Sequence, residues 1–196
     1  MNRVDSYREQ IIYEFSKVWE LNDAAHRIEH FLEVEKCANH INKKLGLKFA
    51  PKLILMVAFF HDMFAWSRHN HHQMSAEWIL TTDLPMICVL KPGEREMVAA
   101  GCREHRASGT EPFSCDFAEL MCSADRGFPT TDVESILQRA IQYRLALGYG
   151  EKDARQGAIE HVKEKFGTEG YARYPEMYQQ AFSYELAIQR ELVDKL

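Results

Sequence analysis

LILMVAFFHD, residues 53–62, is a wholly apolar run of eight residues that ends on a histidine and an aspartate. A segment that is apolar on every side belongs in the interior of a protein. Leucine, methionine, alanine and phenylalanine outnumber the β-branched residues, and no second strand-like segment exists to pair with it, which favours a helix. His61 and Asp62 then stand at the edge of the core, where each needs a partner. A divalent cation would partner both at once.

Length and composition set the class of protein. The 196 residues suit one large domain or two small ones, and the 46% apolar and 27% charged content is typical of a soluble globular protein. The net charge of -5 and the absence of a basic run argue against a nucleic-acid binder. No window is long enough for a membrane span, and the N-terminus is too polar for a signal peptide. Five cysteines without CxxC spacing are typical of reduced thiols, so we expect a cytoplasmic protein without structural zinc.

The rest of the chain also reads as helices. Gly46 stands where a glycine commonly ends a helix, and Pro51 suits the first turn of the helix that carries the apolar run. No internal repeat, low-complexity tract or long linker marks a domain boundary. The sequence therefore predicts one all-α domain, a helical bundle over residues 1–196. The expected helices cover about residues 5–21, 25–45, 51–62, 72–82, 92–106, 114–124, 130–147, 152–165 and 175–192.

Candidate metal ligands occur at four places, each at or near a helix end or on one helix face. A histidine from the second helix and a carboxylate from Asp125 would complete a His-His-Asp-Asp set with the pair that ends the apolar run. Nitrogen and hard oxygen ligands together suit Mn, Fe, Co, Ni, Zn or Mg, and no thiolate is required. The residues are His26 with His30, one helical turn apart; His61 with Asp62; His69, His71 and His72; and His105 with Asp125.

Three local sequences resemble the HD-domain superfamily of metal-dependent phosphohydrolases. HRIEHFLEV (26–34) resembles the HxxxHxxRV run of that family, VAFFHD (57–62) resembles its A-x-L-x-H-D helix end, and FAELMCSADR (117–126) resembles its segment ending in D-A-D-R. The chain departs from the family at Glu33, where an arginine is usual, and at Ser123, where that last segment has its first aspartate. The resemblance covers about residues 20–130, with the C-terminal helices of residues 130–196 expected to pack on this core. It implies four metal ligands: His30, His61, Asp62 and Asp125.

The same resemblance leaves the number of ions open. Some members of the superfamily hold two metals and add one histidine from a helix start and another from a later helix. His71 and His105 occupy suitable positions, although His72 could replace His71. The gap between Asp62 and His71 is shorter than usual for two-metal members. A single ion, with His71 and His105 facing the substrate, is therefore equally compatible with the sequence.

The resemblance implies hydrolysis of a phosphoester in a small phosphorylated metabolite, with a nucleotide among the candidates, by metal-activated water. His71, His105 or Glu104 could carry the proton to the leaving oxygen. Arginines near these positions could hold the phosphate, with His26 at the mouth of the pocket. The arginine candidates are Arg27, Arg68, Arg103, Arg106 and Arg126. The aromatic residues between Phe166 and Tyr184 suit either core packing or a homo-oligomer interface.

Two other functions are compatible with the same residues. Some HD-fold proteins that carry all six ligands are di-iron oxygenases, which here would require His30, His61, Asp62, His71, His105 and Asp125 all to bind iron. Two irons per chain and dioxygen uptake without phosphatase activity would identify that class. The other alternative is a catalytically silent metal- and nucleotide-binding module, which would bind metal tightly and be stabilised by nucleotide without turnover.

Overall fold

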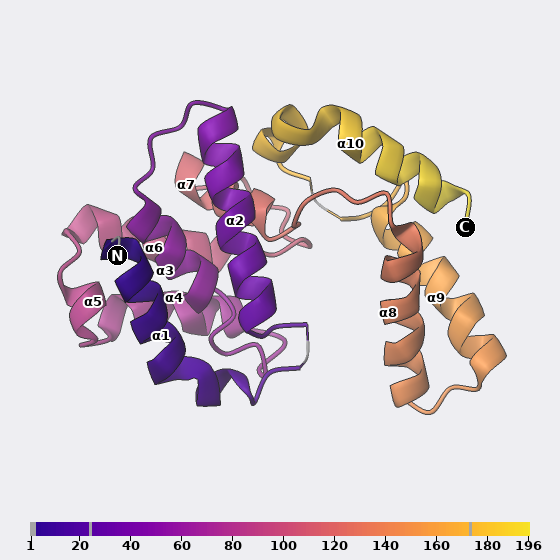
Figure 1. Ribbon diagram of the computed structural model, residues 1–196, viewed down its shortest axis with the longest axis horizontal. Coiled ribbons are helices and arrows are strands. Elements are labelled where there is room, and N and C mark those ends of the chain that lie inside the picture. The colour runs from indigo at the N-terminus through magenta and orange to yellow at the C-terminus, as the bar shows by residue number, and fades with distance from the viewer. Residues whose placement is uncertain (1–2, 24, 173) are drawn as a thin grey trace. The chain divides into compact units, whose positions relative to one another are not determined.

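The computed structural model describes residues 3–23, 25–172 and 174–196. Within these ranges every regular element is a helix, which confirms the all-α prediction (Figure 1). The residues group into two compact units, 1–127 with 174–181, and 128–173 with 182–196. Among the described helices, none is both long enough and apolar enough to cross a bilayer. The helices are α1 Arg3–Trp19, α2 Ile28–Lys44, α3 Pro51–Phe60, α4 His71–Thr81, α5 Pro85–Cys88, α6 Pro92–Glu104, α7 Asp116–Ala124, α8 Val133–Ala146, α9 Glu151–Phe166 and α10 Glu176–Asp194.

Helix α3 is the buried centre of the first unit. Every residue from Leu53 to Phe60 is buried, and α1, α2, α6 and α7 all contact this helix. Aromatic rings pack between these helices. The ring centroid of Trp19 lies 5.0 Å from that of Phe31 and 5.8 Å from that of Phe59. The prediction of a buried helix over the apolar run is confirmed. As a consequence, the end of α3 delivers the next two residues, His61 and Asp62, into the interior.

A glycine lets α6 approach α3 closely. Gly101 lies in the buried part of α6 against Val57 of α3. A Cβ at this position would lie 3.0 Å from Cγ2 and 3.1 Å from Cγ1 of Val57. Because α4 and α7 both pack on α6, this close approach brings the start of α4 and the end of α7 toward the end of α3.

Some helix boundaries differ from those expected. Helix α2 begins at Ile28 rather than near residue 25, because the Asp23 carboxylate accepts a hydrogen bond from the backbone of Ala25 and pairs with His26 instead of capping α2. Helix α7 begins at Asp116, since Ser114 is bound to Glu104. The short helix α5 was not expected. A single turn that begins at a proline carries too little periodicity to be recognised in sequence.

The second unit contains α8, α9 and the part of α10 that begins at Phe182, where the backbone leaves the helical conformation. Helix α8 is capped by Asp132, whose carboxylate accepts a hydrogen bond from the Ser135 backbone N–H, and it packs against α9. Alanines on α9 allow the two helices to approach. The buried core consists of Val133, Leu137, Ile141, Ala154, Ala158, Val162 and Val193. The expectation of a single domain over residues 1–196 stays a prediction.

The glycine that ends α2 provides a test of the fold. Gly46 has φ of +68°, in the left-handed region, with open space around its Cα. We expect Gly46→Ala to lower the free energy of unfolding by about 1 kcal/mol, because a Cβ is strained at this φ. Gly93→Ala is the matched control, since Gly93 lies in α6 at an ordinary φ with equal free space, and should be neutral or stabilising by a few tenths of a kcal/mol. Urea denaturation measures the free energy of unfolding of both variants. An equal change in the two would contradict the left-handed conformation of Gly46.

Candidate metal centre

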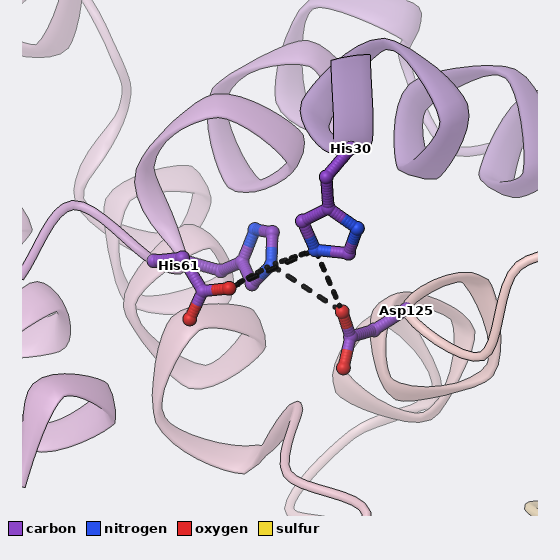
Figure 2. Close-up of side chains that lie close together, drawn as sticks. His30, His61 and Asp125 are labelled. Carbon is purple, nitrogen blue, oxygen red and sulfur yellow. Dashed lines mark hydrogen bonds and ion pairs between the residues drawn. The ribbon is translucent and has the colours of Figure 1, made fainter. Parts of the chain in front are cut away.

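Four side chains from three separate parts of the chain meet at the end of α3. His30 comes from the first turn of α2, His61 and Asp62 follow α3, and Asp125 follows α7. His30 Nε2 lies 3.2 Å from Asp125 Oδ1 and 3.7 Å from Asp62 Oδ2. His61 Nε2 lies 3.2 Å from the same Asp62 oxygen and 3.4 Å from the same Asp125 oxygen. Figure 2 shows His30, His61 and Asp125 pointing toward one another. We call these four residues the first group.

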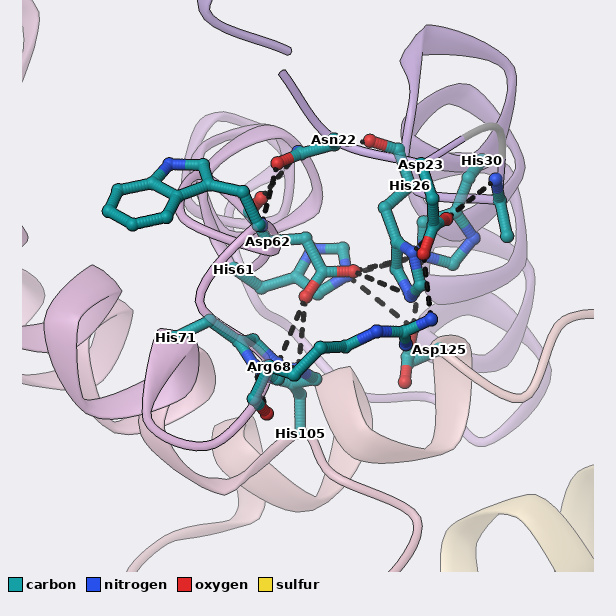
Figure 3. A network of polar contacts seen from close by, with 12 residues as sticks. Asn22, Asp23, His26, His30, His61, Asp62, Arg68, His71, His105 and Asp125 are labelled. Atoms are coloured by element: carbon teal, nitrogen blue, oxygen red, sulfur yellow. Dashed lines mark hydrogen bonds and ion pairs between the residues drawn. The ribbon is translucent and has the colours of Figure 1, made fainter. Parts of the chain in front are cut away.

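Two further histidines face the other oxygen of Asp62. Nε2 of His71, at the start of α4, lies 3.3 Å from Asp62 Oδ1, and Nε2 of His105, just after α6, lies 3.4 Å from it. These three residues form the second group. Figure 3 shows the Asp62 carboxylate between the two histidine pairs. Asp62 therefore belongs to both groups, with one oxygen directed at each.

The hydrogen bonds of the imidazole rings determine which atoms face the centre of each group. Nδ1 of His61 lies 3.1 Å from the carbonyl of Val57 and 3.0 Å from that of Ala58. Nδ1 of His105 lies 2.7 Å from the carbonyl of Cys102, and Nδ1 of His71 lies 3.2 Å from that of Arg68. A carbonyl only accepts, so each Nδ1 carries the proton, and in the neutral ring Nε2 carries a lone pair. In neutral rings, the Nε2 lone pairs and the carboxylate oxygens would face one another with no donor between them, as in the ligand set of a metal.

The spacing of these atoms fits a divalent cation. Ligand atoms about 2.1 Å from an ion are about 3.0 to 3.4 Å apart in octahedral or tetrahedral sites. The Nε2 atoms of His30 and His61 are 3.3 Å apart, and so are those of His71 and His105. Asp62 Oδ1 is buried and makes no hydrogen bond within the described residues. An isolated buried carboxylate oxygen is costly, and a cation beside it would remove the cost.

The charge of the cluster also favours a cation. Burial would raise the pKa of Asp62, but His61 and His105 outweigh it and hold that pKa well below its usual value. Burial acts in the same way on Asp125, whose pKa is nevertheless held low by Arg126, His30 and His61. Burial would lower the pKa of His61, but the two carboxylates raise it to about 10. In the absence of metal, a proton on His61 supplies the positive charge that the carboxylates require, and a bound metal would replace it.

His71 rather than His72 faces the centre. The ring of His72 lies 5.5 Å from that of His71, and His72 belongs to neither group. Burial lowers the pKa of His71 to about 4, which keeps its ring neutral and able to bind a metal. The residue at which α4 begins thus decides which of these two adjacent histidines faces the cluster.

The predicted substrate-binding residues surround the cluster to different degrees. His26 lies beside the first group, with Nε2 3.9 Å from Asp62 Oδ2 and Nδ1 2.6 Å from Asp23 Oδ1. Arg68 pairs with the other oxygen of Asp23 at 2.8 Å, and 60% of its side chain is exposed (Figure 3). The Arg126 guanidinium is almost fully buried and pairs with Asp125, so this contact holds the Asp125 carboxylate in place.

The remaining predicted residues lie outside both groups. Both carboxylate oxygens of Glu104 accept hydrogen bonds from Ser114, at 2.8 Å and 2.6 Å. Arg106 donates to the carbonyl of His69 at 3.2 Å, and the Arg103 side chain is exposed. Arg27 donates to the carbonyl of Asn22 at 3.3 Å. These contacts give none of the four a direct link to the metal cluster.

The supporting roles of two residues, Asn22 and Asp23, were not recognised from sequence. Asp23 pairs with both His26 and Arg68, and the side chain of Asn22 is buried and donates to the carbonyl of Asp62. A polar pair between two helices is ordinary turn composition. Their role depends on segments about forty residues away along the chain.

Comparison with known proteins supplies no function. No family model matches the chain, and no solved structure matches it. A protein of Clostridium beijerinckii described as "Uncharacterized protein" is 28% identical over 104 residues, which cover 52% of this chain and 63% of that protein. The match therefore spans less than two thirds of the relative. The functional conclusion rests on the cluster itself.

Proposed function

We propose that this chain is an HD-type, metal-dependent phosphohydrolase that cleaves a phosphoester of a small phosphorylated metabolite. The observation that carries the proposal is the meeting of four histidines and two aspartates at the end of the buried helix α3, with Asp62 shared between the two groups. The helical fold and the chain order of these residues are those expected from the resemblance to the HD-domain superfamily. Each of the two groups would hold one divalent ion, with Asp62 contributing to both.

The chemistry of such a site suits phosphoester hydrolysis. When bound, divalent ions lower the pKa of water toward neutrality and screen the charge of phosphoryl oxygens. The protein fixes the rings that would bind these ions. Backbone carbonyls hold the imidazoles of His61, His71 and His105 in one orientation. Arg126 restrains Asp125 in the same way.

An exposed arginine and a partly exposed histidine beside the cluster support an anionic substrate. Arg68 is exposed and His26 is partly exposed, and both are held by Asp23 next to Asp62. A guanidinium on a surface carboxylate gains little from that pair, so it can exchange to a phosphate at small cost. The net charge of -5 suits a small substrate better than a polymeric nucleic acid. A nucleotide is one candidate within this class.

The oxygenase alternative also draws support from the six residues. That class requires His30, His61, Asp62, His71, His105 and Asp125 together, and all six lie in the two groups. Histidine and carboxylate ligands suit iron as well as manganese. The two functions differ in the metal they need and in whether dioxygen is consumed.

A screen for phosphate release tests the proposal. The protein, loaded with Mn²⁺, is incubated with nucleoside phosphates and sugar phosphates, and chelated protein serves as the control. We expect phosphate release from a narrow set of these substrates that stops on chelation. Two bound irons with dioxygen uptake and no phosphate release would instead identify an oxygenase. Metal binding with nucleotide-induced stabilisation and no turnover would identify a silent module.

A further inference from the structure

Asn22 joins the turn between α1 and α2 to the connection between α3 and α4, beside the metal cluster. Its side chain is buried, with 2% of the residue exposed. Its amide nitrogen donates to the carbonyl of Asp62 at 3.0 Å and to the carbonyl of His26 at 3.1 Å. Its amide oxygen accepts from the backbone N–H of Trp66 at 3.1 Å. Both donor hydrogens and the acceptor are thus used, each by the main chain of a different residue.

The contact with Asp62 falls just after the end of α3. Helix α3 ends at Phe60, and the carbonyls at a helix end need partners from outside the helix. The Asp62 carbonyl receives the Asn22 amide as well as the backbone N–H of Ala65. Asn22 therefore restrains the main chain of the residue whose carboxylate serves both histidine pairs. Figure 3 shows Asn22 beside Asp62 on the side opposite His105.

The same amide also restrains the loop that leads to His71. Trp66 lies between Asp62 and the start of α4, so its bond to Asn22 holds the middle of this connection. The neighbouring residue, Asp23, binds Arg68 of the same loop. The turn between α1 and α2 thus holds the loop at two points, and both points lie between Asp62 and His71.

We infer that Asn22 is a positioning residue for the metal centre, which holds Asp62 and the loop before His71 at the spacing a cation requires. It does not face the ions and acts through the residues that do. The inference rests on the proposed metal centre and adds a determinant of its affinity. Replacing residues that orient metal ligands typically lowers metal affinity about 10- to 100-fold, and we expect Asn22→Ala to weaken Mn²⁺ binding by that factor.

Asn42 provides a matched control. Its amide nitrogen donates to the carbonyl of Phe49 at 3.1 Å and its oxygen accepts the Phe49 N–H at 3.2 Å. Like Asn22, it hydrogen-bonds main-chain groups through both its amide nitrogen and its amide oxygen, but it lies about 18 Å along α2 from His30. Asn42→Ala should lower thermal stability and leave Mn²⁺ affinity unchanged. A loss of affinity confined to Asn22→Ala therefore separates positioning from general destabilisation.

The experiment is calorimetric titration of chelated and dialysed wild-type protein, Asn22→Ala and Asn42→Ala with Mn²⁺, with folding checked by circular dichroism. Should Asn22→Ala fail to fold, Asn22→Ser replaces it, with an expected loss of about fivefold, the equivalent of one hydrogen bond. Wild-type Mn²⁺ affinity in a folded Asn22 variant, or an equal loss of affinity in Asn42→Ala, would overturn the role of Asn22 but not the proposed metal centre. A wild-type protein that binds no Mn²⁺ or any other divalent ion would overturn the proposed metal centre with it.

Discussion

Asp62→Ala is expected to lose both metal ions and to release phosphate at least about a thousandfold more slowly than the wild-type protein. One oxygen of Asp62 faces His30 and His61, and the other faces His71 and His105, so a single substitution removes a ligand from both groups. Metal ions contribute several kcal/mol to the stabilisation of a phosphoryl transition state, and each 1.4 kcal/mol corresponds to about a factor of ten in rate. Metal content and phosphate release are measured on the same preparation.

Asp83→Ala is the control for Asp62→Ala. Asp83 is an exposed aspartate in the connection between α4 and α5, and its replacement also removes one negative charge. Metal content and rate should both equal those of the wild-type protein. Full metal content and full activity in Asp62→Ala would rule out the proposed centre. Lost activity with retained metal would place the role of Asp62 elsewhere in the reaction.

Removal of metal is expected to lower the melting temperature strongly. The ligands come from α2, the end of α3, the start of α4 and the ends of α6 and α7, so a cation binds only the folded first unit. Free metal at about a thousand times its Kd would stabilise the folded state by about 4 kcal/mol. For a unit of this size that corresponds to a shift of roughly 10 °C or more.

Scanning calorimetry of chelated protein, before and after addition of Mn²⁺, measures this shift. Asp62→Ala should melt at the same temperature with and without Mn²⁺, because its ligand set is broken. Identical melting curves for chelated and Mn²⁺-treated wild-type protein would contradict the account. A shift of equal size in wild type and Asp62→Ala would indicate that Mn²⁺ binds elsewhere.

The central part of the site could be predicted because it depends on local sequence. A helix that is apolar on all sides must be buried, so the polar residues that end it enter the interior together, as His61 and Asp62 do. The remaining ligands were predicted from the resemblance to a known family rather than from periodicity. Periodicity alone does not distinguish His26 from His30, which lie one turn apart on the same helix face.

Other features depend on details that a single sequence does not contain. The choice of His71 over His72 follows from the first residue of α4, and helix boundaries vary by one or two residues between equally plausible readings. The role of Asn22 arises only when Asp62 and Trp66 are brought beside it. The break in α10 at Phe182 lies within a continuous helical pattern, with no proline or glycine to mark it.

The number of metal ions per chain is the most direct test of the central claim, that four histidines and two aspartates form a divalent-metal centre. The protein is purified without added metal and without chelator, and its metal content is measured by mass spectrometry against protein concentration. The account predicts two divalent ions per chain, and a single ion would confine binding to one of the two groups. Folded protein that carries only trace metal, and that takes up none when Mn²⁺, Fe²⁺ or Zn²⁺ is supplied, would contradict it.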